Sequence, residues 1–427
     1  MKKICRSDEI FQLDKKYLSN TYHPIPVALN KGKGVFLWDM EGKKYFDFLS
    51  SYSAVNQGHC HPRLVNIMKA QCEKLTLTSR AFHNSILGSY AKYITQYFGY
   101  QKMLPMNSGV EAVETAIKIT RKWGVVNKDI PDNESQIIVC SQNFHGRTTT
   151  VISFSSEKNA KGNFGPHTPG FINVPYDDLN ALKTVLESNK RIAGFLMEPI
   201  QGEAGVRVPA PDYCQRAHDL CQQYNVLFIA DEIQSGLARS GSLLATCGHC
   251  QCKDICQKNG NHYTRPDIVL LGKALSGGLY PISAVLCDSH IMDVLTPGDH
   301  GSTFGGNPLA SAIAIEALKV IQEEQLMVNA RKKGAYFRYQ LEQYQQSSQI
   351  VQEIRGRGLL NAVVIHSKTN QFLAWDICLR LRDHGLLAKP THGNIIRFAP
   401  PLIITKTQMK HGLEIIINTF KEFEPTD

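Results

Sequence analysis

The sequence predicts an α/β protein with a large domain around a mainly parallel, doubly wound sheet and a smaller α+β domain towards the C-terminus. The first observation is a set of short apolar runs at residues 137–140, 194–197, 226–230, 268–271 and 283–286. Runs of this length without alternation are typical of strands buried on both faces of a sheet. The second is that helical patterns, such as residues 110–123 and 211–224, alternate with these runs. Strands that alternate with helices favour a parallel sheet with helices on both sides.

The segments on either side of this pattern predict other structures. Residues 34–39 and 41–47 predict two short antiparallel strands joined by a turn at Gly42. From about residue 316 a long helical pattern leads to predicted strands at residues 359–365 and 395–398. We therefore divide the chain into an N-terminal segment (1–52), a large domain (53–316) and a small C-terminal domain (317–427).

Composition and charge exclude several classes of protein. Hydrophobic residues make up 43% and charged residues 20% of the 427 residues, a balance typical of globular proteins rather than disordered or fibrous ones. No window approaches the roughly 18 consecutive apolar residues that a membrane span needs. The net charge of +9 is spread along the chain and does not form the basic stripe expected of a nucleic-acid-binding protein. We expect small-molecule ligands, with no nucleic-acid or membrane partner.

The first residues bear on the cellular compartment. Residues 1–9 lack the apolar core of a secretory signal. Asp8 and Glu9 are acidic, which is atypical of a mitochondrial presequence. We expect a cytoplasmic protein, with the mitochondrial matrix as the alternative.

Four of the twelve cysteines lie close together in a stretch at about residues 244–265: Cys247, Cys250, Cys252 and Cys256, with His249 and His262 nearby. A C-x-x-C pattern with further Cys and His residues is typical of zinc or redox sites. A surface insertion with inert thiols explains the same pattern. We leave zinc binding, disulfide formation and inert thiols open, and assign no metal ligand. The other eight cysteines are dispersed, as reduced core cysteines usually are.

Polar side chains follow three of the predicted strands. Asp231 and Glu232 come directly after one apolar run, with Gln234 close behind, and Lys273 and Glu198 follow two others. Ligands of open α/β sheets bind outside the carboxyl ends of the strands. We therefore expect a lysine and carboxylates to converge on one crevice.

Lys273 and Asp231 suggest a particular chemistry. Lys273 lies between an apolar strand and Ala274-Leu275, so its ammonium should be partly desolvated, which lowers its pKa and makes the amine a usable nucleophile. A lysine that extends to solvent from a strand end is the structural alternative. Asp231 is costly to bury unless it meets a cation. Pyridoxal phosphate supplies both a protonated ring nitrogen and an aldehyde that a lysine can capture.

Three sets of residues are suited to hold such a cofactor. Ser108, Gly109 and Val110 begin a strong helical pattern, and a Ser-Gly start to a helix makes an anion site. The loop at residues 301–307, which includes Thr303, offers further hydroxyl and amide donors. Phe144 offers a ring face for stacking, and Arg147 offers a fork for a carboxylate. Helix capping, a glycine-rich turn and core packing are the ordinary explanations of these residues taken singly.

In combination, these residues lie in motifs that resemble the class III aminotransferases. The motifs are Asn-Ser-Gly-Val-Glu-Ala at 107–112, Phe-His-Gly-Arg-Thr at 144–148, Glu-Pro-Ile-Gln-Gly-Glu-Ala-Gly at 198–205 and Asp-Glu-Ile-Gln-Ser-Gly at 231–236. The resemblance spans roughly residues 20–420 and implies the type I fold of pyridoxal-phosphate-dependent aminotransferases. Residues 22–27, 48–59, 271–278 and 385–393 resemble the ornithine δ-aminotransferases within that class.

The resemblance implies a role for each residue of the motifs. Lys273 would be the Schiff-base lysine and proton shuttle, Asp231 the partner of the pyridinium nitrogen, and Gln234 the partner of the 3-hydroxyl group. Phe144 would stack on the ring, beside His145, where some ornithine enzymes carry tryptophan. Ser108, Gly109 and Val110 would hold the phosphate, with Thr303 reaching in from a second subunit. This last role implies a homodimer with active sites at the subunit interface.

The resemblance also implies how substrates are selected. Tyr22 and Arg147 would hold the far end of L-ornithine while Glu203 pairs with Arg397, and Tyr22 and Tyr52 would suit its free α-amino group. When 2-oxoglutarate binds, Arg397 would be free for its α-carboxylate and Arg147 would take the distal one. The expected reaction is ping-pong transfer of the δ-amino group of L-ornithine to 2-oxoglutarate, giving glutamate 5-semialdehyde and glutamate.

Two other functions stay open at this point. An acetylornithine or 4-aminobutyrate aminotransferase would keep the fold and change the substrate. A metal- or redox-sensing binding protein would use the cysteine-rich stretch and keep only a vestigial site. The complete set of Lys273, Asp231 and Arg397 disfavours that last function. The stretch at 244–265 is also longer than the family usually shows.

Overall fold

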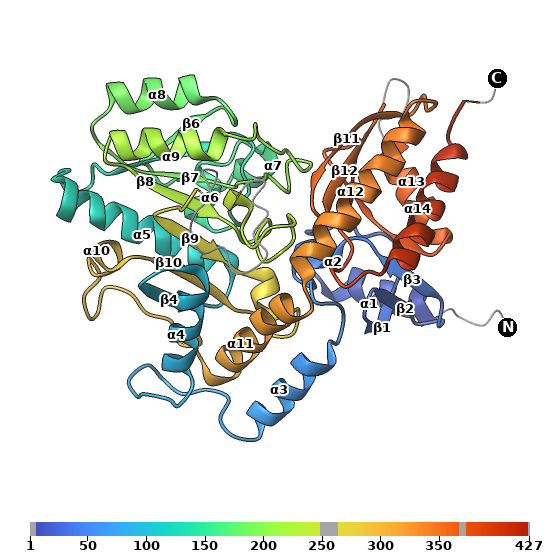
Figure 1. The fold of residues 1–427 in the computed structure, drawn as a ribbon, viewed down its shortest axis with the longest axis horizontal. Coiled ribbons are helices and arrows are strands. Elements are labelled where there is room, and N and C mark those ends of the chain that lie inside the picture. The colour runs from blue at the N-terminus through green and yellow to red at the C-terminus, as the bar shows by residue number, and fades with distance from the viewer. Residues whose placement is uncertain (1–5, 248–263, 367–372, 426–427) are drawn as a thin grey trace.

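A computed structural model describes residues 6–247, 264–366 and 373–425 (Figure 1). Its central element is a seven-stranded sheet in the order β4-β10-β9-β8-β7-β5-β6. These strands are β4 (Lys102–Met106), β5 (Gln136–Cys140), β6 (Phe171–Val174), β7 (Ile192–Met197), β8 (Leu227–Asp231), β9 (Ile268–Leu271) and β10 (Ser283–Cys287). β10 runs antiparallel to both of its neighbours, β4 and β9, and the other pairings of this sheet are parallel. The predicted mainly parallel sheet is therefore confirmed.

Helices cover both faces of this sheet. The helices of the described chain are α1 (Arg6–Tyr17), α2 (Ser50–Ser53), α3 (Pro62–Cys72), α4 (Leu87–Phe98), α5 (Gly109–Lys128), α6 (Thr149–Ser153), α7 (Lys158–Lys161), α8 (Leu179–Ser188), α9 (Tyr213–Gln223), α10 (Ser289–Met292), α11 (Pro308–Glu323), α12 (Leu326–Gln345), α13 (Leu373–Asp383) and α14 (Lys406–Lys421), with short 3₁₀ turns η1 (Ala245–Cys247) and η2 (Lys273–Ser276). In β5, Ile137 and Val139 pack in one core with α5, whereas Ile138 and Cys140 pack in another with α8 and α9. Successive side chains of a strand point to opposite faces, so this split shows a doubly wound sheet.

Two smaller sheets lie beside the large one (Figure 1). The first, in the order β1-β2-β3-β13, contains β1 (Leu29–Lys33), β2 (Phe36–Asp39), β3 (Lys44–Asp47) and β13 (Leu386–Leu387). The second, in the order β11-β12-β15-β14, contains β11 (Val351–Arg357), β12 (Leu360–Ile365), β14 (Lys389–Thr391) and β15 (Ile395–Phe398). The predicted hairpin around Gly42 is confirmed as the antiparallel pair β2–β3. Its partner β13 comes from the far end of the chain and was not predicted.

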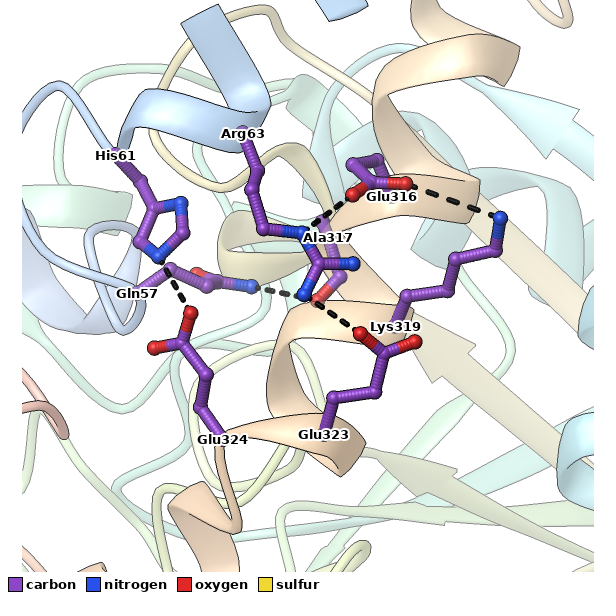
Figure 2. A network of polar contacts seen from close by, with 8 residues as sticks. All are labelled: Gln57, His61, Arg63, Glu316, Ala317, Lys319, Glu323 and Glu324. Carbon is purple, nitrogen blue, oxygen red and sulfur yellow. Dashed lines mark hydrogen bonds and ion pairs between the residues drawn. The ribbon is translucent and has the colours of Figure 1, made fainter.

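A polar network joins Gln57, α3 and α11 (Figure 2). Arg63 of α3 forms ion pairs with Glu316 and Glu323 of α11, each at 2.7 Å. The buried side chain of Gln57 donates from Nε2 to the carbonyl oxygens of Ala274, at 3.0 Å, and Ala317, at 3.3 Å. Since Ala274 follows Lys273 in the chain, Gln57 fixes the backbone of η2 against α11.

The described residues bear in part on the expectations about membrane spans, metal sites and the cysteine-rich stretch. Within the described ranges, no helix has both the length and the apolar character needed to cross a membrane. The same ranges contain no cluster of three or more His, Cys, Asp or Glu side chains arranged to hold a metal ion. Cys250, Cys252 and Cys256, with His249 and His262, lie outside the described residues. Cys247 is described and is buried in η1.

Candidate active site

Three neighbouring strands deliver the central side chains of the site. Asp231 ends β8, Glu198 follows β7, and Lys273 stands two residues after β9. Because β7, β8 and β9 are parallel neighbours, their carboxyl ends meet at one edge of the sheet. A cavity of about 190 Å³ lies at this edge. It is lined by Gly109, Val110, Phe144, His145, Gly146, Glu198, Ile200, Glu203, Asp231, Ile233, Gln234 and Lys273.

Lys273 is held in an unusual conformation inside this cavity. Its φ angle of +43° lies in the left-handed region, which a residue with a side chain rarely adopts. Burial lowers the pKa of Lys273, although the carboxylates of Glu203 and Asp231 act in the opposite direction. A lowered pKa increases the neutral fraction of the amine, which is the nucleophilic form. The environment expected from the sequence is therefore present.

Asp231 and His145 form a buried pair. Oδ2 of Asp231 is 2.7 Å from Nδ1 of His145, and Oδ1 accepts a hydrogen bond from the backbone N–H of Ile233 at 3.1 Å. Burial alone would lower the pKa of His145, but the hydrogen bond to Asp231 and its charge outweigh this effect and raise that pKa. Asp231 and His145 therefore hold each other in a fixed orientation.

Glu198 is a site residue to which sequence reasoning gave no role, although its position after an apolar run was the available signal. Its Oε1 accepts a hydrogen bond from the N–H of Phe144 at 2.8 Å, and its Oε2 accepts one from Gly202 at 3.4 Å. Glu198 thus joins the loop that carries Phe144 to the loop that carries Glu203. Burial raises the pKa of Glu198 to about 7. Ile200, Ile233 and Gly146 also line the cavity and were not predicted.

The start of α5 closes one side of the cavity. Ser108 caps the helix: its Oγ accepts from the N–H of Glu111 at 3.3 Å, and its own N–H donates to the carboxylate of Glu111 at 2.5 Å. The N–H groups of Gly109 and Val110 have no partner within the helix, as at every helix start. An anion placed there meets free donors and the positive end of the helix dipole.

An ion pair closes another side. Nη1 of Arg397, in β15, is 2.5 Å from Oε1 of Glu203, and Nε2 of Gln234 donates to the same oxygen at 3.1 Å. Burial would raise the pKa of Glu203, but Arg397 and Lys273 outweigh it, and the pKa is lowered. The guanidinium of Arg397 also lies over the ring of Tyr52, 5.0 Å from its centroid. Glu203 and Tyr52 therefore hold Arg397 from two sides.

Tyr52 belongs to a left-handed turn. Ser50, Ser51, Tyr52 and Ser53 have φ angles of 50°, 46°, 57° and 72°, so α2 is left-handed. This conformation costs roughly 1–2 kcal/mol for each residue with a side chain. Such an outlier persists only where its surroundings hold it in place.

Tyr22, Arg147 and Thr303 are exposed and do not line the cavity. Tyr22 is 74% exposed, with Nζ of Lys389 at 5.8 Å from its ring centroid. Arg147 is exposed and lies over the ring of Phe144, at 5.3 Å. Thr303 is exposed, although its neighbour Ser302 accepts a hydrogen bond from Asn107 at 2.9 Å, next to the start of α5. The structure therefore brings together Lys273, Asp231, His145, Phe144, Gln234, Glu203, Gly109 and Val110, with Ser108, Arg397 and Tyr52 adjoining.

The cavity fits pyridoxal phosphate by the chemistry of its donors and by its free polar atoms. Among the described residues, Oε1 of Gln234 and Nε2 of His145 are buried without a hydrogen-bond partner. A Cβ at Gly202 would lie 1.4 Å from Oε1 of Gln234, and one at Gly146 would lie 2.3 Å from a methyl carbon of Val110. These two glycines therefore allow close approach of loops around the cavity. An amine, a carboxylate, a free amide oxygen and a helix start face one another there, as the cofactor requires.

Comparisons with known proteins agree with this geometry. The family described as aminotransferase class-III matches residues 17–420. The chain is 53% identical to "Ornithine aminotransferase, mitochondrial" of Rattus norvegicus, over 98% of this chain and 91% of that protein. A solved ornithine aminotransferase from Toxoplasma gondii superposes with a TM-score of 0.93 at 45% identity, covering 97% of this chain and 94% of the other, and its description mentions PLP at the active site.

A second solved structure is also similar to this chain. An acetylornithine aminotransferase from Elizabethkingia anophelis superposes with a TM-score of 0.87 at 50% identity, covering 98% of this chain and 99% of the other. The match over nearly the whole chain, the type I architecture and the lysine–aspartate cavity agree with one another. The chain belongs to the class-III aminotransferase family, and it is a pyridoxal-phosphate-dependent transaminase.

Proposed function

We propose that the chain transfers the δ-amino group of L-ornithine to 2-oxoglutarate, giving glutamate 5-semialdehyde and glutamate, with the two substrates using one cavity in turn. The observation that carries the proposal is the ion pair of Glu203 and Arg397 beside Lys273. Its paired and open states would suit two substrates of different charge. The similarity to ornithine aminotransferases over nearly the whole chain supports the same conclusion.

Four side chains would hold the cofactor and move the proton. When bound, pyridoxal phosphate supplies an aldehyde that accepts the amino group and a ring that withdraws electrons from the reacting carbon. Lys273 would anchor it and later carry a proton on Nζ, because burial lowers the pKa of this amine. Asp231 would face the ring nitrogen, and Oε1 of Gln234 would accept a hydrogen bond from the ring hydroxyl. Phe144 would stack on the ring.

The remaining residues would select the substrates. With ornithine in the site, Glu203 keeps Arg397 neutralised, so no free cation competes for the α-carboxylate. That carboxylate and the α-amine would lie near Tyr22, Tyr52 and Arg147. With 2-oxoglutarate, Glu203 would turn away, Arg397 would bind the α-carboxylate and Arg147 the distal one. A planar guanidinium suits both carboxylates because it donates two parallel hydrogen bonds.

Acetylornithine or 4-aminobutyrate is the alternative amino donor. The similarity to the Elizabethkingia anophelis acetylornithine aminotransferase favours keeping this alternative. The two donors differ from ornithine at the α-amine, which is acylated in one and absent in the other. Tyr22 and Tyr52 are therefore the residues expected to discriminate between the three.

The first test is the visible absorption spectrum of the purified holoenzyme, before and after L-ornithine is added without a keto acid. Loss of the yellow band with ornithine, but not with acetylornithine or 4-aminobutyrate, supports the proposal. A band that does not change with ornithine but is lost with another amine would overturn ornithine as the substrate and leave the role of Lys273 unchanged. Recovery of the band with 2-oxoglutarate, compared with pyruvate, then tests the acceptor.

We also propose a homodimer in which Thr303 of each subunit serves the site of the other. Thr303 is exposed, and the neighbouring Phe304 is 46% exposed, which leaves an aromatic side chain for a partner surface. Light scattering gives the assembly, and mixed subunits test the shared site. Lys273→Ala and Thr303→Ala subunits, inactive or weak alone, should regain activity when mixed. Mixing without recovery overturns the shared site.

The compartment stays a prediction. We propose the cytoplasm. The mitochondrial matrix is the alternative, because the Rattus norvegicus relative carries the word mitochondrial in its name. Microscopy of the full chain with a C-terminal fluorescent tag, against a matrix marker, decides between the two.

A further inference from the structure

The left-handed turn at residues 50–53 is held from both of its ends. Asp47, the last residue of β3, lies three residues before Ser50. Oδ1 of Asp47 accepts hydrogen bonds from the N–H groups of Leu49 and Ser50, both at 2.8 Å. On the far side of the turn, Asn56 accepts two hydrogen bonds from the buried guanidinium of Arg239. The backbone between these two points is therefore fixed where it begins and where it ends.

Asp47 is itself oriented by a histidine. Its Oδ2 lies 2.7 Å from Nε2 of His59, and the Asp47 side chain is almost completely buried. The backbone of His59 is fixed as well, because it exchanges hydrogen bonds with Gly34 at 2.8 and 2.9 Å. His59 therefore holds the Asp47 carboxylate in the orientation in which its other oxygen caps the turn.

The turn presents its side chains to the strand that carries Arg397. Oγ of Ser50 donates to the carbonyl oxygen of Ala399, two residues after Arg397, at 2.7 Å. The ring of Tyr52 lies under the Arg397 guanidinium. The carbonyl oxygen of Tyr52 accepts from Nε2 of Gln234, which also donates to Glu203. A shift of this turn would move the ring away from the guanidinium that Glu203 also holds.

We propose that Asp47 and His59 are positioning residues for substrate selection, because they hold residues 50–53 in the left-handed turn that keeps the Tyr52 ring against Arg397. Neither side chain lines the cavity, so both act through Tyr52. The inference rests on the proposed function, in which Arg397 alternates between Glu203 and a substrate carboxylate. Its consequence is that selectivity, rather than the capacity for transamination, depends on Asp47 and His59.

The experiment compares L-ornithine with 5-aminopentanoate, which is ornithine without its α-amine. For Asp47→Ala in the holoenzyme, the ratio of kcat/KM for ornithine to that for 5-aminopentanoate should fall about tenfold, because a ring–cation contact and its orientation are lost. The dissociation constant of glutarate, an unreactive dicarboxylate, should rise about threefold in calorimetry for the same reason. Asp47→Asn keeps the acceptor for both N–H groups and should stay within about twofold of wild type.

Glycine supplies a rescue that a merely structural role would not show. Glycine adopts the left-handed region at little cost, so Ser51→Gly added to Asp47→Ala should restore about half of the lost selectivity on a logarithmic scale. Arg63→Met is the matched control: it breaks the ion pairs of Figure 2, and it should lower Tm without changing the selectivity ratio. If Asp47→Ala is insoluble, His59→Leu decides, with an expected fall of about threefold.

Two results would overturn the inference. One is a wild-type selectivity ratio in Asp47→Ala, or in His59→Leu, accompanied only by a lower Tm like that of Arg63→Met. The other is a fall in selectivity that Ser51→Gly does not reduce. Failure of the proposed function can be distinguished from failure of this inference, because the wild-type holoenzyme would then not react with ornithine. The glutarate measurement would still report whether Asp47 supports Arg397.

Discussion

Nδ1 of His145 lies 2.7 Å from Oδ2 of Asp231, and both side chains are almost completely buried. His145 therefore supports the carboxylate that would face the cofactor. Burial would lower the pKa of His145, but the hydrogen bond to Asp231 and the charge of Asp231 outweigh burial and raise that pKa. This contact holds the Asp231 carboxyl group at the place where the protonated ring nitrogen is proposed to lie.

Replacing His145 should weaken cofactor binding. In His145→Phe the Asp231 carboxylate loses a charge-assisted hydrogen bond, so the dissociation constant of pyridoxal phosphate should rise about tenfold or more. Titration of the cofactor into the apoenzyme, followed at the yellow band, measures it. Phe154→Leu is the control, because it changes packing against the His145 ring and leaves the bond intact. Equal affinities in wild type and His145→Phe would contradict this prediction.

Tyr22→Ile should change substrate preference without changing stability. Tyr22 is exposed and lies beside Lys389. Lys389 stands opposite Arg397 in the register of the antiparallel strands β14 and β15. Without the hydroxyl, kcat/KM for ornithine should fall about tenfold, and use of 4-aminobutyrate should improve. Tyr17→Ile, at another exposed tyrosine, should leave both unchanged. An equal loss for both substrates would count against a selective role of Tyr22.

Glu198 should make stability depend on pH. Burial raises its pKa to about 7 from an ordinary value of 4.5, so the folded state binds this proton more tightly than the unfolded state does. Its stabilising contribution is complete below about pH 4.5 and is lost as the pH rises through about 7. The free energy of unfolding of wild type relative to Glu198→Gln should therefore fall by on the order of 1–3 kcal/mol between pH 5 and 8. Urea unfolding of both proteins measures this difference, and a difference that does not change with pH would refute the assignment.

Gln57 should affect both stability and turnover. Gln57→Leu removes the two hydrogen bonds to Ala274 and Ala317, which should cost about 1–3 kcal/mol and loosen the turn that follows Lys273. The Tm of thermal unfolding and kcat should both fall. Arg63→Met, in the same network of Figure 2 but without a contact to η2, should lower only the former. Matching kcat values for the two variants would show that Gln57 has no special link to Lys273.

Apolar runs were enough to predict five of the strands in the large sheet, because a strand buried on both faces must be apolar throughout. The strand β4 escaped because it contains Pro105, which argues against a central strand. It is tolerated since β4 is an edge strand of the seven-stranded sheet. The strand β13 has two residues and gains its partner β3 only through the tertiary fold, so no local pattern could have indicated it.

The candidate site divides in a similar way. Asp231 ends a strand, and Gln234 and Lys273 follow strands closely, where ligand-binding residues of open α/β sheets lie, so these three could be predicted from the sequence. The roles of His145 behind Asp231 and of Glu198 between two loops depend on contacts across the cavity. The left-handed turn at Ser50–Ser53 contains no glycine, so the sequence gives no sign of it. Contacts with Asp47 and Ala399, which form only in the folded protein, hold it.

The pairing of β3 with β13 also sets the order in which the chain can be completed. Every strand of the seven-stranded sheet lies between residues 102 and 287, so that sheet can close while later residues are still being synthesised. The first small sheet must wait for Leu386 and Leu387, and Ser50 must wait for Ala399, which is 349 positions away. Strands β1, β2 and β3 therefore keep an open edge until residues 386–387 have been made, and their sheet is completed only after the seven-stranded sheet can close.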